Sequence, residues 1–286
     1  MRRKLEEQLK GIEIPFADVQ SWFDRYTAAT IERNPAGREG LILKREHTFR
    51  VLEETELLVW QLHAAGQHKI VERRGIGEQR LDIARTIAIL HDAGRFLQFE
   101  RYGSFADFET CNHAAMSVRI AHRELRTMFR DVKDVFQRLI LRPIAFHNRL
   151  VVPKGEDSDV IFYTNIIRDA DKIDILRVMN DISSSESQEL RNTVLLGLGQ
   201  DGDISDAVFT RVMDGKPVDY SIMKNHSDFR ALLLGWAFDI HFDEALQRIL
   251  DIGLFQMILG SIPHTEKRDR LEQRVFGYIG GRLGEI

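Results

Sequence analysis

The chain has 286 residues, and its 40 Lys and Arg residues against 44 Asp and Glu residues give a net charge of −4, which argues against an extended nucleic-acid-binding surface. Its length is sufficient for a full hydrophobic core of an ordinary globular protein. The single cysteine, Cys111, excludes an intramolecular disulfide and a Cys-x-x-Cys metal or redox site, so we expect a reducing compartment, the cytoplasm.

The first ten residues are basic but lack the apolar stretch of a secretory signal, and no later run approaches the roughly 18 apolar residues of a membrane span. We therefore expect no membrane partner. The first strong helical pattern covers residues 51–62, where apolar side chains recur on one face up to a predicted end near Gly66. His47 lies one turn before Val51 on the same face.

The next predicted helix covers residues 81–91. Its period places His91 and the adjacent Asp92 on the buried stripe of the helix. Residues 94–110 are rich in Gly, Ser, Asp and aromatic side chains, and we expect them to form a loop. A histidine and a carboxylate should therefore meet where a buried helix ends.

Three further helices are predicted. Asn112 is expected to cap the first of them, which carries His113 on its apolar face. The second carries His147 in near register with preceding apolar residues, although Pro143 should kink it or end it early. The third, residues 160–179, is apolar on several sides and is therefore expected to be buried.

The composition of the sequence changes at about residue 183. A polar stretch, residues 183–187, is followed by predicted turns rich in Gly and Asp and then by further predicted helices. We expect residues 1–180 to form a site-bearing helical core with N-terminal helices, and residues 181–286 to form a helical extension packed on it. Strand-like alternation is scarce throughout, so the predicted fold class is all-α.

Six residues combine metal-ligand chemistry with positions that should face the core: His47, His91, Asp92, His113, His147 and Asp171. A buried carboxylate without a partner is so unfavourable that it usually neutralises or binds a cation. Four neutral imidazoles and two carboxylates, without sulfur, suit iron, manganese, cobalt, nickel or zinc. We expect one or two divalent transition-metal ions per chain.

The order of these residues resembles that of the HD-domain phosphohydrolase superfamily, named for its adjacent His-Asp pair, and more narrowly its members with two additional histidines and a dinuclear centre. The family's motif residues map, in chain order, to His47, to the pair His91 and Asp92, and to Asp171. The additional histidines would be His113 and His147. The resemblance covers about residues 40–180 and implies an HD-domain-like all-α core.

The resemblance implies a metal-dependent phosphohydrolase that cleaves a small phosphoester, a nucleotide or a related metabolite, by a metal-activated hydroxide. Asp92 is the candidate bridging carboxylate. One metal would be held by His47, His91 and Asp171, and the other by His113 and His147. Two divalent ions against two carboxylates leave a net positive cluster that attracts phosphate.

Two basic residues are candidates for binding the phosphate. Lys172 adjoins Asp171, and relatives with a similar Asp-Lys pair use that lysine on substrate phosphate. Arg95 follows the His-Asp pair and could clamp phosphate through two hydrogen bonds. The alternative for each is a solvated surface charge. Asp107 is either a general acid for the leaving oxygen or the cap of a turn, and the turn is favoured.

Periodicity alone leaves one ligand undecided, because Asp169 and Asp171 can both be drawn on an apolar face of their helix. The resemblance favours Asp171, which leaves Asp169 to brace a histidine or to pair with an arginine. The glycine spacing of residues 197–202 matches a dinucleotide-binding motif. No strand–helix–strand pattern surrounds it, so a turn is favoured. Cys111 and the remaining histidines are interpreted as packing or surface residues.

Two functions of other classes stay open. The same six residues resemble those of the di-iron oxygenases in this superfamily, whose metals activate dioxygen. The chain is alternatively a non-catalytic regulator that binds a metal or a nucleotide and is stabilised by it. The sequence does not specify the substrate, the metal, the general acid, the oligomeric state or the role of residues 181–286.

Overall fold

The computed structural model describes residues 15–64, 78–128, 137–183, 198–199 and 202–284. Helices dominate these residues, which contain no β-strand and only one isolated β-bridge, between Gly199 and Asn225. The predicted all-α fold class is confirmed. The chain divides into two compact units, Met1–Asp171 and Lys172–Ile286, and the long helix α10 (Ser158–Ser183) contains the boundary.

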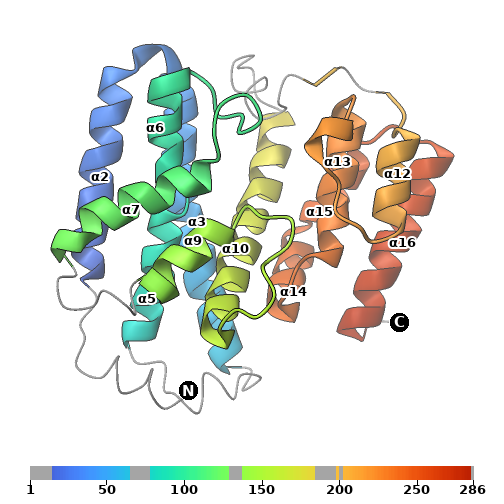
Figure 1. Ribbon diagram of the computed structural model, residues 1–286. Coiled ribbons are helices and arrows are strands. Elements are labelled where there is room, and N and C mark those ends of the chain that lie inside the picture. The colour runs from blue at the N-terminus through green and yellow to red at the C-terminus, as the bar shows by residue number, and fades with distance from the viewer. Residues whose placement is uncertain (1–14, 65–77, 129–136, 184–197, 200–201, 285–286) are drawn as a thin grey trace. The chain divides into compact units, whose positions relative to one another are not determined.

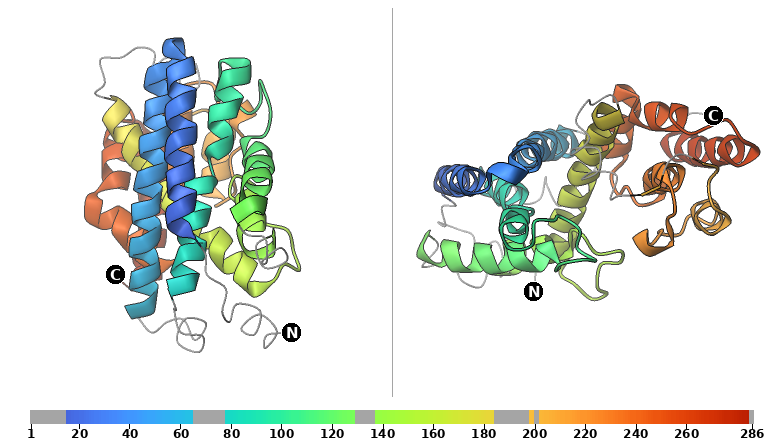
Figure 2. Two further views of the ribbon diagram at one scale, coloured as in Figure 1. Left: turned by 90° about the vertical axis from the view of Figure 1, so that its left-hand side faces the viewer. Right: turned by 90° about the horizontal axis from the view of Figure 1, so that it is seen from above.

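The first unit carries the helices that surround the predicted ligands, and Figure 2 shows the first two long helices running side by side. In chain order, its elements are α2 (Phe16–Arg33), the 3-10 turn η1 (Pro35–Gly37), α3 (Arg38–Ala64), α5 (Glu78–Leu90), α6 (Ala93–Tyr102), α7 (His113–Met128), the π-helical turn η2 (Gln137–Leu141), α9 (Arg142–Phe146) and the first half of α10 (Figure 1).

The helix α5 lies at the centre of this unit and packs against α2, α3, η2 and α9. Nearly every described residue of its second half is buried, including Ile87, Ile89 and Leu90. Such a helix can bury all its sides only when neighbours surround it. Its C-terminal end, where His91 and Asp92 follow, therefore opens into the interior and not into solvent.

The prediction of a loop over residues 94–110 is wrong for its first part, because α6 occupies Ala93–Tyr102. Its buried residues include Phe96 and Gln98, so one face of this short helix packs inward. Gly94, expected in this loop, instead lies at a close contact between α6 and α7. The helix ends at Gly103, whose φ of 67° is left-handed and favours glycine.

The other helices predicted for the first unit are present, but their first and last residues differ from the predicted ones. The helix predicted over residues 51–62 begins earlier, because α3 starts at Arg38 and includes His47. The side-chain oxygen of Asn112 accepts a hydrogen bond from the N–H of Ala115 at 2.9 Å, which confirms the predicted cap of α7. The predicted helix around Pro143 is divided into the π-helical turn η2 and the short helix α9, and Pro143 occupies the first turn of α9, a position that suits proline.

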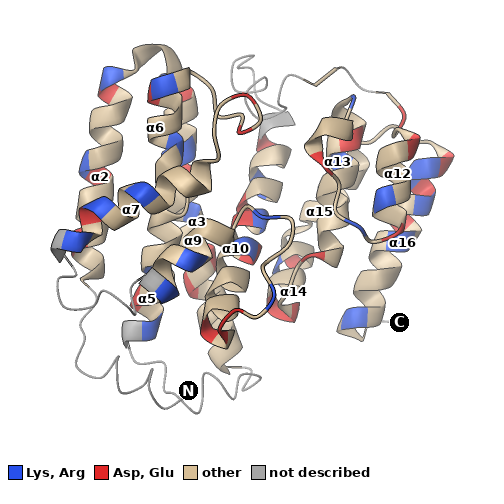
Figure 3. Cartoon of the chain, in the orientation of Figure 1, with Lys and Arg blue, Asp and Glu red and all other residues tan. Residues whose placement is uncertain are grey.

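The second unit contains further helices after the second half of α10. They are α12 (Asp206–Met213), η3 (Tyr220–Ile222), α13 (His226–Gly235), η4 (Trp236–Phe238), α14 (Asp243–Ile252), α15 (Leu254–Gly260) and α16 (Glu266–Leu283). Lys, Arg, Asp and Glu residues are interspersed along α16 (Figure 3). None of the helices among the described residues of the chain has the length and apolar character needed to cross a membrane.

Some sequence predictions fall outside the described residues. They are the basic start of the chain, the helix end near Gly66, the histidine His68, most of the polar stretch at residues 183–187, and much of the glycine-rich string at residues 197–202.

Candidate metal centre

The six residues predicted as metal ligands lie together in the first unit. They come from the middle of α3, the junction between α5 and α6, the first residue of α7, the residue after α9, and α10. All are buried except the Asp171 side chain, which is 17 % exposed. In chain order they are His47, His91, Asp92, His113, His147 and Asp171.

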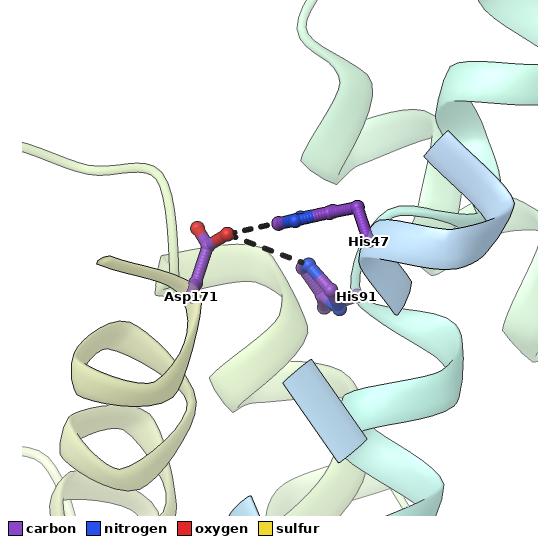
Figure 4. A group of neighbouring side chains, drawn as sticks. All are labelled: His47, His91 and Asp171. Carbon is purple, nitrogen blue, oxygen red and sulfur yellow. Dashed lines mark ion pairs between the residues drawn. The ribbon is translucent and has the colours of Figure 1, made fainter. Parts of the chain in front are cut away.

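Three of these residues, His47, His91 and Asp171, form a first group. His47 Nε2 lies 3.1 Å from Asp171 Oδ1, and His91 Nε2 lies 3.9 Å from the same oxygen. Figure 4 shows both rings directed at this carboxylate. Bonds of about 2.0–2.2 Å to one ion place two ligand atoms roughly 3–4 Å apart, so the observed spacing fits a shared ion.

The other three residues, Asp92, His113 and His147, form a second group. Asp92 Oδ1 lies 3.2 Å from His113 Nε2 and 3.9 Å from His147 Nε2. The two Nε2 atoms lie 3.0 Å from each other. Within each group, one ligand atom per residue can be chosen so that all lie within 4.8 Å of one another.

Asp92 stands between the two groups. Its Oδ1 faces the second group, whereas its Oδ2 lies 3.7 Å from His47 Nε2 in the first. Although Asp92 occupies the N-cap position of α6, its carboxylate does not cap that helix. Both oxygens are therefore directed at histidines, which is the arrangement of a carboxylate that can bridge two ions.

The hydrogen bonds of the histidine rings identify the protonated nitrogens. Nδ1 of His91 lies 2.7 Å from the carbonyl oxygen of Ala88, and Nδ1 of His147 lies 2.7 Å from that of Ile144. A carbonyl oxygen only accepts, so each Nδ1 donates and each neutral ring offers an Nε2 lone pair. His91 Nε2 is buried and has no hydrogen-bond partner among the described residues.

The contact between His113 and His147 is the strongest sign of a cation. His113 Nδ1 donates to the Asp107 carboxylate at 2.7 Å, so its Nε2 also carries a lone pair. Two lone pairs facing each other at 3.0 Å repel unless a proton or a cation lies between them. Burial and the neighbouring histidines lower the pKa of His147 to about 3, which disfavours a proton. The residues therefore fit a metal ion.

The pKa values of three further candidate ligands are also lowered, which favours their deprotonated forms. Burial lowers the pKa values of His91 and His113 below the ordinary histidine value. Burial alone would raise the pKa of Asp92, but the charges of Lys44 and Arg95 hold it well below its usual range. Metal ligands must be deprotonated to bind, so the site is prepared for a cation.

A close contact between α6 and α7 sets the position of the second group. A Cβ on Gly94 would lie 2.3 Å from the His113 carbonyl oxygen and 2.6 Å from the Ser117 nitrogen. The Gly94 N–H also donates to Ser117 Oγ at 2.8 Å. Glycine at this position therefore lets the first turn of α7 approach Asp92. On the other side, the Arg168 guanidinium on α10 donates to the His147 carbonyl at 3.1 Å.

Two cations lie against Asp92. Lys44 Nζ, one turn before His47 on α3, is 3.3 Å from Asp92 Oδ2. Arg95 Nε is 3.5 Å from Asp92 Oδ1, and its Nη1 donates to Asp107 at 2.8 Å and to the Phe105 carbonyl at 2.5 Å. Sequence reasoning named Arg95 but missed Lys44, although its spacing from His47 places both on one face of α3.

Lys172 lies next to Asp171 in the sequence and is the first residue of the second unit, where it pairs with Asp239. Its Nζ is 2.8 Å from Asp239 Oδ2 and 3.2 Å from the Asp239 carbonyl oxygen. The residue is 7 % exposed, so it is not the solvated surface charge that was the alternative reading. Its role on substrate phosphate stays a prediction.

Asp107 has a place that sequence reasoning did not foresee. Its carboxylate accepts hydrogen bonds from the ring of His113 and from Arg95, and also from Gln98 Nε2 at 3.0 Å. Burial would raise its pKa, but the hydrogen bond to His113 and the nearby charges lower it to about 2. An ionised carboxylate does not protonate a leaving group, so the general-acid reading loses support.

The remaining candidates lie outside both groups. Asp169 is fully buried on α10 but belongs to neither. Cys111 is half-buried, with its Sγ 2.9 Å from Met116 Sδ. Among the other described histidines, none belongs to either group; they are His63, His122, His226, His241 and His264.

The HD domain family model matches residues 45–176, which span all six residues and Lys172. No curated protein and no solved structure matches the chain. The match identifies residues 45–176 as an HD domain, and the two His/Asp groups could hold a metal, which is consistent with the HD-domain phosphohydrolase superfamily. HD domains bind divalent metals and are all-α, and the helical structure of the described residues agrees with this architecture.

Proposed function

We propose that the chain is a metal-dependent phosphohydrolase that cleaves a small phosphoester, a nucleotide or a related metabolite. The observation that carries this proposal is Asp92, whose two carboxylate oxygens face separate groups of histidines. An HD domain over residues 45–176 supports the same class of reaction.

In this proposal, the first ion is held by His47, His91 and Asp171, the second by His113 and His147, and Asp92 bridges them. Iron, manganese, cobalt, nickel and zinc all suit this donor set. Two divalent ions, when bound, supply positive charge for phosphate oxygens and lower the pKa of water. Two carboxylates cancel only half of the four positive charges, so an anionic substrate is attracted.

The protein's own residues position the ligands. The carbonyl oxygens of Ala88 and Ile144 orient the rings of His91 and His147, so that each Nε2 is directed at its carboxylate. Lys44 and Arg95 keep Asp92 ionised and add positive charge beside it. Arg95 and Lys172 are the proposed phosphate-binding residues, and each would exchange part of its present contacts for substrate.

The test is phosphate release from a panel of nucleoside mono-, di- and triphosphates, sugar phosphates and p-nitrophenyl phosphate. Protein loaded separately with each of the five metals should release phosphate, and a chelator should stop the reaction. The variant Asp92→Asn should be inactive with an unchanged helical circular dichroism spectrum. Loaded protein that turns over nothing on the panel, or undiminished turnover by Asp92→Asn, would contradict the proposal.

A further inference from the structure

The histidines of the two groups differ in what lies behind their rings. Nδ1 of His91 and of His147 donates to a neutral backbone carbonyl oxygen in the preceding turn. Nδ1 of His113 instead faces a carboxylate, at 2.7 Å from Asp107 Oδ2 and 2.9 Å from Asp107 Oδ1. Of these three rings, only that of His113 donates to a charged acceptor.

Asp107 is itself held from several directions. Arg95 and Gln98 donate to its Oδ1 at 2.8 and 3.0 Å. Gln98 is fully buried on α6, and its amide also donates to the Cys111 carbonyl at 3.0 Å. The carboxylate position is therefore determined by α6 and by the segment that leads into α7.

The same carboxylate also reaches the other histidine of the second group. Asn148, which follows His147 directly, places its Nδ2 3.4 Å from Asp107 Oδ2. The backbone N–H of His113 lies 3.4 Å from the same oxygen. Asp107 thus joins the two segments that carry His113 and His147, while neither group of candidate ligands includes it.

A carboxylate behind a metal-binding histidine fixes the ring orientation and makes the free nitrogen a stronger donor, and its loss typically weakens metal binding by about 10- to 100-fold. We infer that Asp107 is a positioning residue for the second metal position, the one formed by Asp92, His113 and His147. The two positions are consequently unequal, and removal of Asp107 weakens metal binding at the second while sparing the first. This inference rests on the proposed metal centre.

The experiment is equilibrium dialysis of metal-free protein against Mn²⁺ over a range of concentrations, with metal measured by elemental analysis. Wild-type protein should bind two ions per chain. Asp107→Ala should bind the first ion as wild type does and the second about 10- to 100-fold more weakly. Asp107→Asn should be intermediate, because an amide oxygen still accepts from His113 but carries no charge.

The matched control is Glu100→Ala, which removes another carboxylate of this region, one that pairs with Arg33 at 2.8 Å. It should leave both ions bound. Two ions of wild-type affinity in Asp107→Ala, or parallel loss of both ions from the folded alanine and asparagine variants, would overturn the inference. Because only metal is measured, a chain that loses one ion in this way supports the inference even if no phosphoester is cleaved.

Discussion

Replacing Gly94 by alanine should push the first turn of α7 away from Asp92. The new Cβ would lie 2.3 Å from the His113 carbonyl oxygen and 2.6 Å from the Ser117 nitrogen. Both are backbone atoms, so no side-chain rotation relieves the contact. A carbon and an oxygen without a bond between them approach to about 3.3 Å, so α7 must shift by about 1 Å.

Overpacking of this kind costs about 1–3 kcal/mol, and loss of the hydrogen bond from the Gly94 N–H to Ser117 Oγ costs about 1 kcal/mol. Alanine in place of glycine within a helix returns up to about 1 kcal/mol. We therefore expect the free energy of unfolding of metal-free protein to fall by about 1–3 kcal/mol. The second ion should also bind more weakly, because His113 begins α7.

The assay is urea unfolding of chelated protein followed by circular dichroism, with metal content measured separately. Ser117→Ala is the control for the hydrogen bond alone and should cost only about 1 kcal/mol with both ions retained. Gly277→Ala, on α16 with no atom within 4 Å of its added Cβ, should not destabilise the protein. A Gly94→Ala variant with wild-type stability and wild-type metal content would refute the reasoning.

Two further predictions concern α10. Asp171→Ala should lose metal and activity. Asp169→Ala should keep its metal and lose about 1–3 kcal/mol of stability, because it removes a fully buried polar group that has an interaction partner. Metal analysis with unfolding curves checks this, and the reverse pattern would exchange their roles. Lys172→Ala should raise the KM for substrate with metal content unchanged. Asp239→Ala, which removes the carboxylate that pairs with the ammonium, should not raise it; equal KM increases in both variants would assign Lys172 to the ion pair alone.

The helical periods predicted most of what positions the site. Val51 and His47 are both buried on α3, as their spacing indicated, and His91 and Asp92 lie at the buried end of α5. The choice of Asp171 over Asp169, which periodicity could not make, agrees with the group that the structure brings together. These features could be predicted because helix geometry determines which residues of one segment share a face.

The contacts between segments could not be predicted in the same way. Asp107 lies six residues before His113 in an irregular segment, so no period relates its carboxylate to that ring. Gly94 was misread because a glycine required by a close helix contact has the same sequence signature as a glycine in a loop. The position of Lys44 beside the site is predictable in the same way as that of His47, because residues three apart on a helix share one face.

The central claim is that two ions share the Asp92 carboxylate, and anomalous X-ray scattering from crystals grown with Mn²⁺ tests it most directly. Two anomalous peaks should lie beside Asp92, one among His47, His91 and Asp171 and the other between His113 and His147. Their separation should be about 3.5–4 Å, as in other two-metal sites. Crystals of metal-treated protein with no anomalous peak at these residues would contradict the account.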